Sequence, residues 1–427
     1  MAATPRQDPP DATIPRTVLI VEDQRSLAEM LGSMLRNLCG CETMIAASYA
    51  RAQQLLSEPG RTFLAAICDV NLPDAPYGEA IDLVSRHAMP VVALTGTITA
   101  EVRSMMRQGT IVDYVLKKGV VSYEYVAQLV RRLQRNRSVK VVVADDSQAS
   151  RDVLQRMLHI QGLTVLTAEN GAEAIALLAQ HPDTRLVLVD YNMPKVDGFE
   201  FAPQARRMMG KDRLAIIGIS GEDRPDVSAQ FLKHGANDFI SKPYSYEEMT
   251  CRINQNLEML ELVESLHHMA TRDYLTDLNN RRTFFDRGEA LLRQAQAGQQ
   301  TVGIAMMDID HFKRINDEHG HQQGDLVLQA VAAELLHHFP HDLVARLGGE
   351  EFAVLFTGPA SEDALRARLE SFRELLPAAI AARCPQVGAT TVSLGLCCAA
   401  NTGLSELLHA ADKRLYQAKA QGRNRLV

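Results

Sequence analysis

The chain has 427 residues, which suggests about three domains, and its hydrophobic content of 46% is ordinary for globular protein. The net charge of -7 offers no basic surface for nucleic acid or for an anionic membrane. No apolar run reaches the roughly 18 residues that a membrane span needs. Residues 1–16 are polar and proline-rich and lack the apolar core of a signal peptide, so we expect a disordered tail on a cytoplasmic protein.

Residues 17–136 alternate short apolar strands with amphipathic helical patterns. Such repeated units predict a doubly wound parallel sheet with helices on both faces, whose site forms where the strands end. Three acids at that edge would repel each other unless a cation joined them, and Mg²⁺ prefers oxygen ligands. Helix N-capping would explain one acid but not the whole set. The predicted strands end in the polar side chains Glu22, Asp23, Asp69, Thr95 and Lys117.

This set of strand ends resembles the receiver domain of response regulators. The resemblance implies that Asp69 accepts a phosphoryl group from a histidine kinase or a phosphotransfer protein. Lys118 departs from the family pattern, because a proline that helps to fix the turn usually stands there. The resemblance implies Mg²⁺ (or Mn²⁺) ligands at Glu22, Asp23 and the carbonyl of Asn71, phosphoryl contacts from Thr95 and Lys117, and an aromatic switch at Tyr114.

Residues 138–256 repeat the pattern at a spacing of one domain length, which indicates an internal duplication. Here the receiver pattern is complete, with Pro243 after the lysine, so we favour Asp190 over Asp69 as the phosphoacceptor. The arginines of the intervening run 131–137 are interpreted as cations at a helix C-terminus rather than as a partner-binding patch. By the same resemblance the second site comprises Asp145, Asp146 and the Asn192 carbonyl as metal ligands, Ser220 and Lys242 at the phosphoryl group, and Phe239 as the switch.

Residues 246–270 contain no glycine or proline, and apolar residues recur at steps of three and four. This spacing predicts one long helix with an apolar stripe. Its first half is interpreted as the last receiver helix. Residues 257–271 lie beyond the expected end of the receiver, where the stripe has nothing of its own chain to cover. We therefore expect a short two-chain coiled coil there.

Residues 346–352 read RLGGEEF and lie between two short apolar runs, a pattern typical of a tight hairpin. Gly348 and Gly349 permit positive φ and let a ligand approach the backbone. Glu350 and Glu351 follow at the bend, where a hairpin by itself has no need of paired acids. Carboxylates so placed suit a divalent metal that holds phosphates.

The stretch resembles the GGDEF signature of diguanylate cyclases, in its GGEEF form. Four further blocks of residues 272–427 occur in the family's order: DYLTDLNNRR at 273–282, DIDHFKRIND at 308–317, GHQQGD at 320–325 and LYQAKAQGRN at 415–424. The resemblance implies condensation of two GTP molecules into cyclic di-GMP. Since each domain carries one set of site residues, it also implies a homodimer.

The resemblance assigns roles to single residues of this domain. Asp308, Glu350 and the carbonyl of Ile309 would hold Mg²⁺, with Glu351 supporting a second ion, and Glu350 would help to deprotonate the attacking hydroxyl. Asn316 and Asp325 would bind the guanine edge. Lys313, Lys419 and Arg423 would meet the terminal phosphates, the last two from one helix face because they are four apart.

One family feature is absent from the window before the signature. The R-x-x-D pair, where product binds and inhibits, reads FPHD here, so that Phe339 replaces the arginine and Asp342 is present. A phenyl ring makes no bidentate contact with phosphate or guanine. We therefore expect weak or absent product inhibition.

The whole predicts an α/β multidomain chain, and its order of domains resembles that of the PleD-type response regulators. Two flavodoxin-like receivers (17–136 and 138–256) and a helical connector (257–271) precede an α+β domain of the nucleotidyl-cyclase kind (272–427). Two rivals remain open. One is a signalling or phosphorelay scaffold that binds GTP without catalysis, and the other is a cyclase that selects a different base.

Overall fold

The computed structural model describes residues 16–87, 89–97, 99–107, 111–221, 225–297, 302–356, 361–400 and 402–427. All but the last residue of the expected N-terminal tail, 1–16, lies outside this part of the chain. The protein divides into two compact units, Met1–Val263 and Glu264–Val427. Within the described ranges, no helix has the length and apolarity that crossing a membrane demands.

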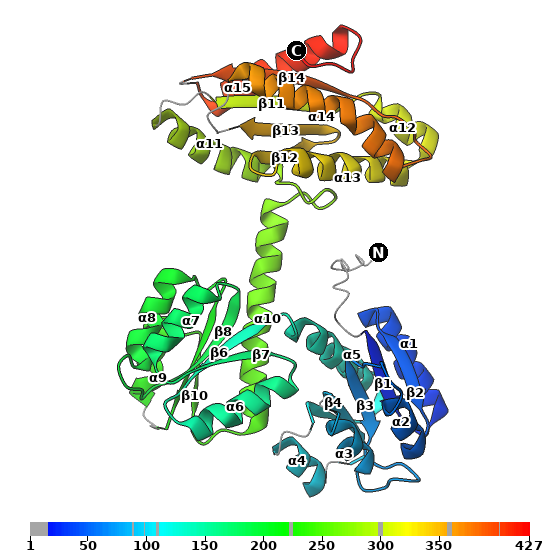
Figure 1. Cartoon of the computed structure of the whole chain (residues 1–427), viewed down its shortest axis with the longest axis vertical. Helices are drawn as coiled ribbons and strands as arrows, with labels where there is room; N and C mark the ends of the chain where they lie inside the picture. The colour runs from blue at the N-terminus through cyan, green and yellow to red at the C-terminus, as the bar shows by residue number, and fades with distance from the viewer. Residues whose placement is uncertain are drawn as a thin grey trace. The chain divides into compact units, whose positions relative to one another are not determined.

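The N-terminal unit begins with a five-stranded parallel sheet in the order β2-β1-β3-β4-β5 (Figure 1). Its apolar strands are buried on both faces, as in other doubly wound sheets. The strands are β1 (Thr17–Val21), β2 (Glu42–Ala46), β3 (Ala65–Asp69), β4 (Val91–Thr95) and β5 (Asp113–Leu116). One core forms beneath α1 (Arg25–Cys39) and α5 (Gly119–Asn136), and the other beneath α2 (Tyr49–Leu56), α3 (Glu79–Ser85) and α4 (Ala100–Arg107).

A second parallel sheet, in the order β10-β9-β8-β6-β7, repeats this strand order. The predicted flavodoxin-like fold is confirmed. The strands are β6 (Lys140–Ala144), β7 (Thr164–Ala168), β8 (Thr184–Asp190), β9 (Ala215–Ser220) and β10 (Asp238–Ser241). One core lies beneath α6 (Gln148–Ile160) and α10 (Tyr246–Thr271), and the other beneath α7 (Gly171–Gln180), α8 (Gly198–Met208) and α9 (Pro225–Lys233).

Helix α10 is continuous over 26 residues, as the periodicity predicts. The expectation that its stripe from Leu257 onward has nothing of the receiver to cover was wrong. Leu257 and Leu260 are buried in the core of the second sheet. The exposed apolar side chains of α10 lie on a different face of the helix from Leu257 and Leu260. They are Met259, Leu262, Leu266 and Met269.

The basic run at the end of α5 lies at a helix C-terminus, as predicted, and two of its arginines also form ion pairs. Arg135 Nη1 lies 2.6 Å from Glu261 Oε2 of α10, and Arg132 forms an ion pair with Glu258 one turn earlier. These side chains therefore hold α5 against α10 within the N-terminal unit. Arg135 stands in the last turn of α5, as predicted, whereas the acidic partners could not be predicted because they stand more than 120 residues later in the chain.

A buried polar contact accompanies these ion pairs. Asn136 Nδ2 donates to the carbonyl of Gln161 at 2.7 Å, and Gln161 Nε2 donates to the hydroxyl of Tyr246 at 2.9 Å. Tyr246 is the first residue of α10, yet its ring packs in a core of the first sheet. Burial raises the pKa of this tyrosine to about 12, so its hydroxyl stays protonated. The two sheets of the unit thus share a packed contact.

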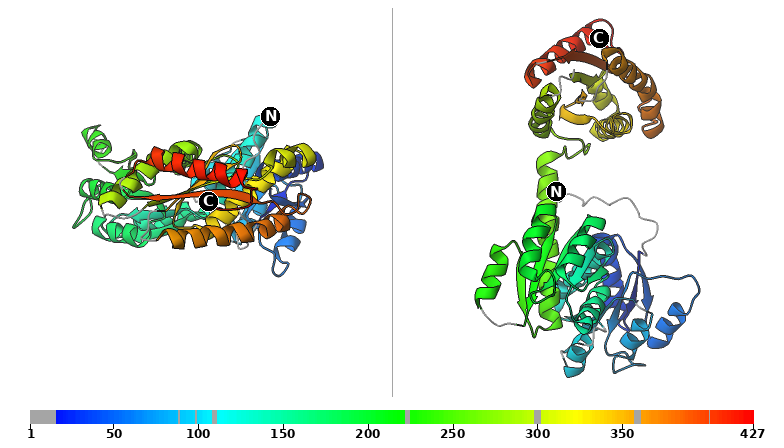
Figure 2. Two further views of the ribbon diagram at one scale, coloured as in Figure 1. Left: turned by 90° about the horizontal axis from the view of Figure 1, so that it is seen from above. Right: turned by 60° about the vertical axis from the view of Figure 1, so that its left-hand side comes forward.

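The C-terminal unit contains a four-stranded antiparallel sheet in the order β12-β13-β11-β14. Helices cover both of its faces (Figure 2), which confirms the α+β prediction. The strands are β11 (Val302–Ile309), β12 (Leu343–Gly348), β13 (Glu351–Phe356) and β14 (Val392–Ala399). On one face lie α12 (Phe312–His319), α13 (His321–His338) and α14 (Glu362–Arg383), and on the other α11 (Arg281–Ala297) and α15 (Leu404–Ala420).

Candidate functional site

The strand ends of the first sheet bring together two buried acids and a lysine. Lys117 Nζ lies 2.7 Å from both Glu22 Oε2 and Asp69 Oδ2. Burial raises the pKa of Glu22, against the opposing effect of Lys117. Burial lowers the pKa of Lys117, but its hydrogen bonds with the two carboxylates outweigh that effect and raise it. The lysine is therefore held as a cation between two acids.

Asp23 completes an acidic triple in this sheet. Oxygen atoms of Glu22, Asp23 and Asp69 all lie within 4.8 Å of one another, and in the described ranges this is the only such triple of possible metal ligands. Asn71 N–H donates to Asp69 Oδ1 at 3.2 Å, which places its own backbone beside the cluster. These oxygens fit a hard cation such as Mg²⁺, because carboxylate and carbonyl oxygens are the ligands that such a cation prefers.

Lys118, the departure from the receiver pattern, does not displace the neighbouring lysine. In the second sheet, Lys242 Nζ lies 3.0 Å from Asp145 Oδ2 and 2.5 Å from Asp190 Oδ1. The corresponding distances in the first sheet are equally short, although Lys118 stands where Pro243 stands in the second. Both lysines therefore bridge the acid of the first strand and the acid of the third.

The second cluster follows the same plan. Burial raises the pKa of Asp190, while Lys242 lowers it. Asn192 N–H donates to Asp190 Oδ2 at 3.0 Å, and Ser220 is buried at the end of β9. Asp146 is exposed beside Asp145. The predicted switch residue Phe239 packs against Phe231, at 6.0 Å between ring centroids.

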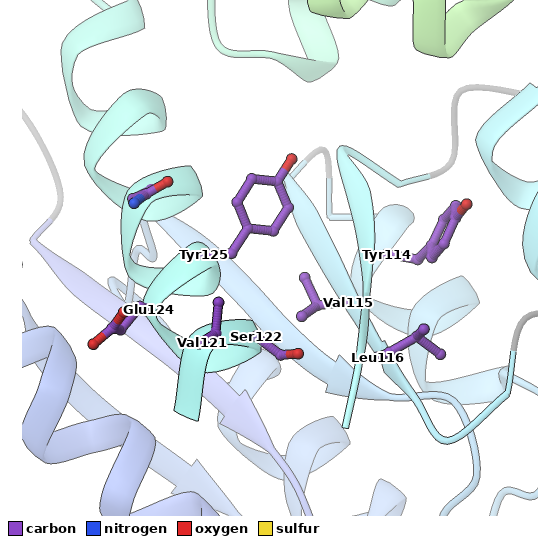
Figure 3. A pocket seen from close by; sticks show the side chains of 8 residues that line it. Tyr114, Val115, Leu116, Val121, Ser122, Glu124 and Tyr125 are labelled. Carbon is purple, nitrogen blue, oxygen red and sulfur yellow. The ribbon is translucent and has the colours of Figure 1, made fainter. Parts of the chain in front are cut away.

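The other predicted switch residue, Tyr114, lines a pocket between β5 and α5 (Figure 3). Tyr125 stands on the opposite side of this pocket, and its hydroxyl donates to Asp113 Oδ2 at 2.6 Å. Burial raises the pKa of Asp113. Thr95, which is buried, donates its hydroxyl to the carbonyl of Thr97 at 2.7 Å. The ring of Tyr114 packs against the core beneath α2, α3 and α4, on the other side of β5 from Tyr125 in Figure 3.

The C-terminal unit places its predicted acids at neighbouring strand ends. Asp308 on β11 pairs across the sheet with Glu351 on β13. Between β12 and β13 the chain turns at Gly349 and Glu350, and Gly349 has a φ of 51°, in the left-handed region that favours glycine. The turn thus brings the two hairpin acids beside Asp308.

Asp308 is 6% exposed, and Lys419 Nζ from α15 lies 2.7 Å from its Oδ2 atom. Burial raises the pKa of Asp308; Lys419 lowers it, and the charges of Glu350 and Glu351 raise it further. Asp308, Glu350 and Glu351 offer carboxylate oxygens, the donors that Mg²⁺ or Mn²⁺ prefers, although these oxygens are not all within 4.8 Å of one another as those of the Glu22 triple are. The residues present therefore fit a divalent cation.

Arg346 holds the hairpin turn, and the sequence reasoning missed it. Its Nε and Nη2 atoms donate to the carbonyl of Gly349 at 2.9 and 2.7 Å, and Nη1 lies 3.0 Å from Asp273 Oδ1. Hydrogen bonding from Thr276 and Arg346 lowers the pKa of Asp273, although burial opposes it. Two features of the sequence could have indicated this contact: an arginine stands close to the glycine pair, and an aspartate is the first residue of the DYLT block.

The residues assigned to the nucleotide lie on several elements around this edge. Lys313 and Asn316 are on α12, and Asp325 begins the second turn of α13. Gly324 lies against Asn316, whose Oδ1 would be 2.0 Å from a Cβ atom at that position. The side chains of Lys313 and Asp325 are exposed, so both are open to a ligand.

Arg423 is not on the helix face that the four-residue spacing predicts. Helix α15 ends at Ala420, and Arg423 follows with a φ of 63°. Gly422, at a φ of 113°, interrupts the helix before it. Arg423 is therefore carried by a left-handed turn, while Lys419 remains on the last turn of α15.

In the segment 339–342, where the arginine of the R-x-x-D pair is absent, Phe339 and Asp342 both make contacts within the domain. Phe339 is 1% exposed and packs against Phe356 and Phe372. Arg368 of α14 lies over the Phe339 ring, and its Nη2 atom is 2.6 Å from Asp342 Oδ2. The carboxylate of this window is therefore already paired with an arginine of α14.

Comparison with known families agrees with two of the three predicted domains. Residues 270–425 match the family described as "Diguanylate cyclase, GGDEF domain", and residues 141–254 match the "Response regulator receiver domain" family. For residues 17–136, the interpretation as a tandem receiver rests on the shared strand order and on the acid and lysine cluster, and it stays a proposal.

Individual relatives match different lengths of the chain. The response regulator PleD of Caulobacter vibrioides is 30% identical over 300 residues, 67% of this chain and 65% of PleD. Diguanylate cyclase DgcM of Escherichia coli is 36% identical over 186 residues, 43% of this chain and 44% of DgcM. The chain thus spans less than two thirds of either relative. A crystal structure of a two-component response regulator with a GGDEF domain is 40% identical, with a TM-score of 0.53, covering 58% of this chain and 99% of that one.

Proposed function

Because the chain carries a response regulator receiver domain followed by a GGDEF domain of the diguanylate cyclase family, we propose that it condenses two GTP molecules into cyclic di-GMP and two pyrophosphates. The observation that carries the proposal is the buried Asp308, which lies beside the hairpin acids and is paired with Lys419. Acids and an ammonium at one point suit a metal-bound triphosphate.

In the proposed reaction, Lys313, Lys419 and Arg423 hold the terminal phosphates, and Asn316 and Asp325 bind the guanine edge. Glu350 accepts the proton of a ribose 3′-hydroxyl, whose oxygen forms a bond to the α-phosphorus of the other nucleotide while the bond to pyrophosphate breaks. The same exchange with the roles reversed closes the ring. A divalent cation, when bound by Asp308, Glu350 and the carbonyl of Ile309, supplies neutralisation of the charge on the phosphates.

Each chain offers one set of these residues, while the product joins two nucleotides symmetrically. The active species in the proposal is therefore a homodimer with two half-sites facing each other. Phosphorylation at Asp190, by a histidine kinase or a phosphotransfer protein, raises the population of that encounter. The long helix α10 would transmit receiver pairing to the catalytic domain, and the stripe it exposes supports this role.

The test incubates the purified chain with GTP and Mg²⁺, and separately with ATP, and follows cyclic dinucleotide by chromatography. The expected result is cyclic di-GMP from GTP alone, and its loss in Glu350→Ala. Glu289→Ala, which removes an exposed acid of α11, is the matched control and keeps wild-type turnover. GTP binding without turnover would favour the scaffold, and turnover of ATP would favour a cyclase that selects another base.

A further inference from the structure

Asp310 is a buried acid that the proposed reaction does not use. It follows β11 directly, two residues after Asp308, and is 5% exposed. A carboxylate buried in this way is destabilising unless its oxygens are hydrogen-bonded. Its partners therefore indicate what it is for.

Within the described ranges, the hydrogen-bond partners of the Asp310 carboxylate are neutral donors. Oδ1 accepts from the hydroxyl of Ser393 at 2.7 Å. Oδ2 accepts from the hydroxyl of Thr391 at 2.7 Å and from the backbone N–H of Asn424 at 3.0 Å. The Asp310 N–H also donates to the Thr391 carbonyl at 2.9 Å. Both oxygens are thus engaged, and hydrogen bonds to an ionised acceptor are strong ones.

The bond to Asn424 fixes an unusual piece of backbone. Gly422, Arg423 and Asn424 have successive φ values of 113°, 63° and 45°. Left-handed backbone is unfavourable for the two residues with side chains and persists where the surroundings hold it. Arg423 N–H donates to the carbonyl of Ala418, and Arg373 Nη1 donates to Asn424 Oδ1 at 2.9 Å. Asp310 supplies the acidic partner among these contacts, and Arg373 supplies the basic one.

We propose that Asp310 is a positioning residue that holds this left-handed turn and thereby directs Arg423 toward the terminal phosphates of bound GTP. The inference rests on the proposed function, because it takes the phosphates as the target of Arg423. Two acids at the end of β11 would then contribute to nucleotide binding in different ways. Asp308 meets the cation directly, and Asp310 acts through the turn that carries an arginine.

Binding measurements separate this role from a general structural one. The ligands are guanosine 5′-(α,β-methylene)triphosphate, which cannot release pyrophosphate, and GMP, which lacks the terminal phosphates. Titration calorimetry of the full chain in Mg²⁺ is expected to show Asp310→Asn binding the triphosphate about 10-fold more weakly, the effect of one charged contact, with GMP affinity unchanged. Asp412→Asn, which removes an exposed acid of α15, is the matched control and leaves both affinities unchanged.

A double-mutant cycle tests whether Asp310 acts through Arg423. Combined with Arg423→Ala, Asp310→Asn is expected to weaken triphosphate binding by less than about 2-fold more, because coupled residues are not additive. Equal losses for GMP and the triphosphate, or additive losses in the cycle, would overturn the proposal. Loss of Mg²⁺ binding in Asp310→Asn would overturn it too, since the residue would then be a metal ligand.

A second variant covers the case in which Asp310→Asn does not fold. Gly422→Ala puts a Cβ on a residue at a φ of 113°, and so strains the same exposed turn from its other side. The same selective loss of triphosphate affinity is expected, and unchanged affinity would refute a positioning role for the turn. If the wild-type chain binds neither guanine nucleotide, it is the proposed function that fails, which is a distinct outcome.

Discussion

The exposed stripe of α10 predicts that replacing two of its leucines weakens the proposed homodimer. Met259, Leu262, Leu266 and Met269 are 59%, 54%, 53% and 64% exposed and follow one another at steps of three, four and three residues. This is the spacing of the apolar seam of a coiled coil. The variant carries both Leu262→Glu and Leu266→Glu.

The size of the effect follows from the exposed fractions. Full burial of a leucine contributes about 1.5–3 kcal/mol, so burying the half that is still exposed contributes about 1 kcal/mol. Two leucines in each of two chains contribute about 4 kcal/mol, which corresponds to a dimer dissociation constant raised by roughly 1,000-fold. Repulsion between the introduced carboxylates adds to this loss.

Sedimentation velocity over a protein concentration series measures the dissociation constant, and turnover of GTP per chain is followed over the same series. Both transitions are expected to move together to higher concentration. His267→Glu is the control for an added carboxylate, because it places one negative charge about 100° further round the helix than Leu266. An unchanged dissociation constant in the double variant would refute the coiled coil, and full turnover by a monomeric variant would refute the half-site mechanism.

Three further predictions concern the sites themselves. Treatment with acetyl phosphate is expected to label Asp190, as mass mapping of peptides would show, whereas label confined to Asp69 would contradict the assignment. Cyclic di-GMP at low micromolar concentration is expected to leave the initial rate unchanged, because Phe339 is buried and Arg368 already occupies the acid of that window. Affinity for Mg²⁺ is expected to fall on acidification from a higher pH than for an ordinary aspartate, because the charged form of Asp308 binds the ion and its pKa is raised.

The predictions on product inhibition and on metal affinity would each be contradicted by a specific result. Inhibition by low micromolar product would show that the window binds cyclic di-GMP without its usual arginine. Metal affinity that holds constant until the pH range of a free aspartate would mean that burial of Asp308 does not govern the site. A loss of affinity on the alkaline side would have the wrong sign, since deprotonation of Asp308 favours the cation.

The positions of the acidic site residues could be predicted from the sequence, because the end of a strand is marked by residues that are close together in the chain. An apolar run followed at once by an acid, as at Asp69, Asp190 and Asp308, marks both the strand and the edge where its side chain emerges. Gly349 likewise marks a turn by its own lack of a Cβ atom. For these residues, the spacing in sequence and the place in the fold depend on the same few neighbours.

Other features depend on contacts between distant parts of the chain. Leu257 was expected to lie outside the receiver, yet the core of the second sheet reaches it, because helical spacing shows which residues share a face but not what covers that face. Arg423 was expected on a helix, but the turn at Gly422 ends α15 first. No role could be assigned to Asp310 from the sequence, because its partner Asn424 stands more than 100 residues away.

The sequence by itself therefore determined the kinds of sheet, the acids at their edges and the family of the catalytic domain, since each depends on residues close together in the chain. Only the tertiary structure decided which apolar stripe of α10 stays exposed, which acids the arginines of α5 meet and how Arg423 is held. Those features depend on contacts between buried surfaces and charged groups that are far apart in the sequence and meet only in the folded protein. The spacing of residues along the chain does not specify such contacts.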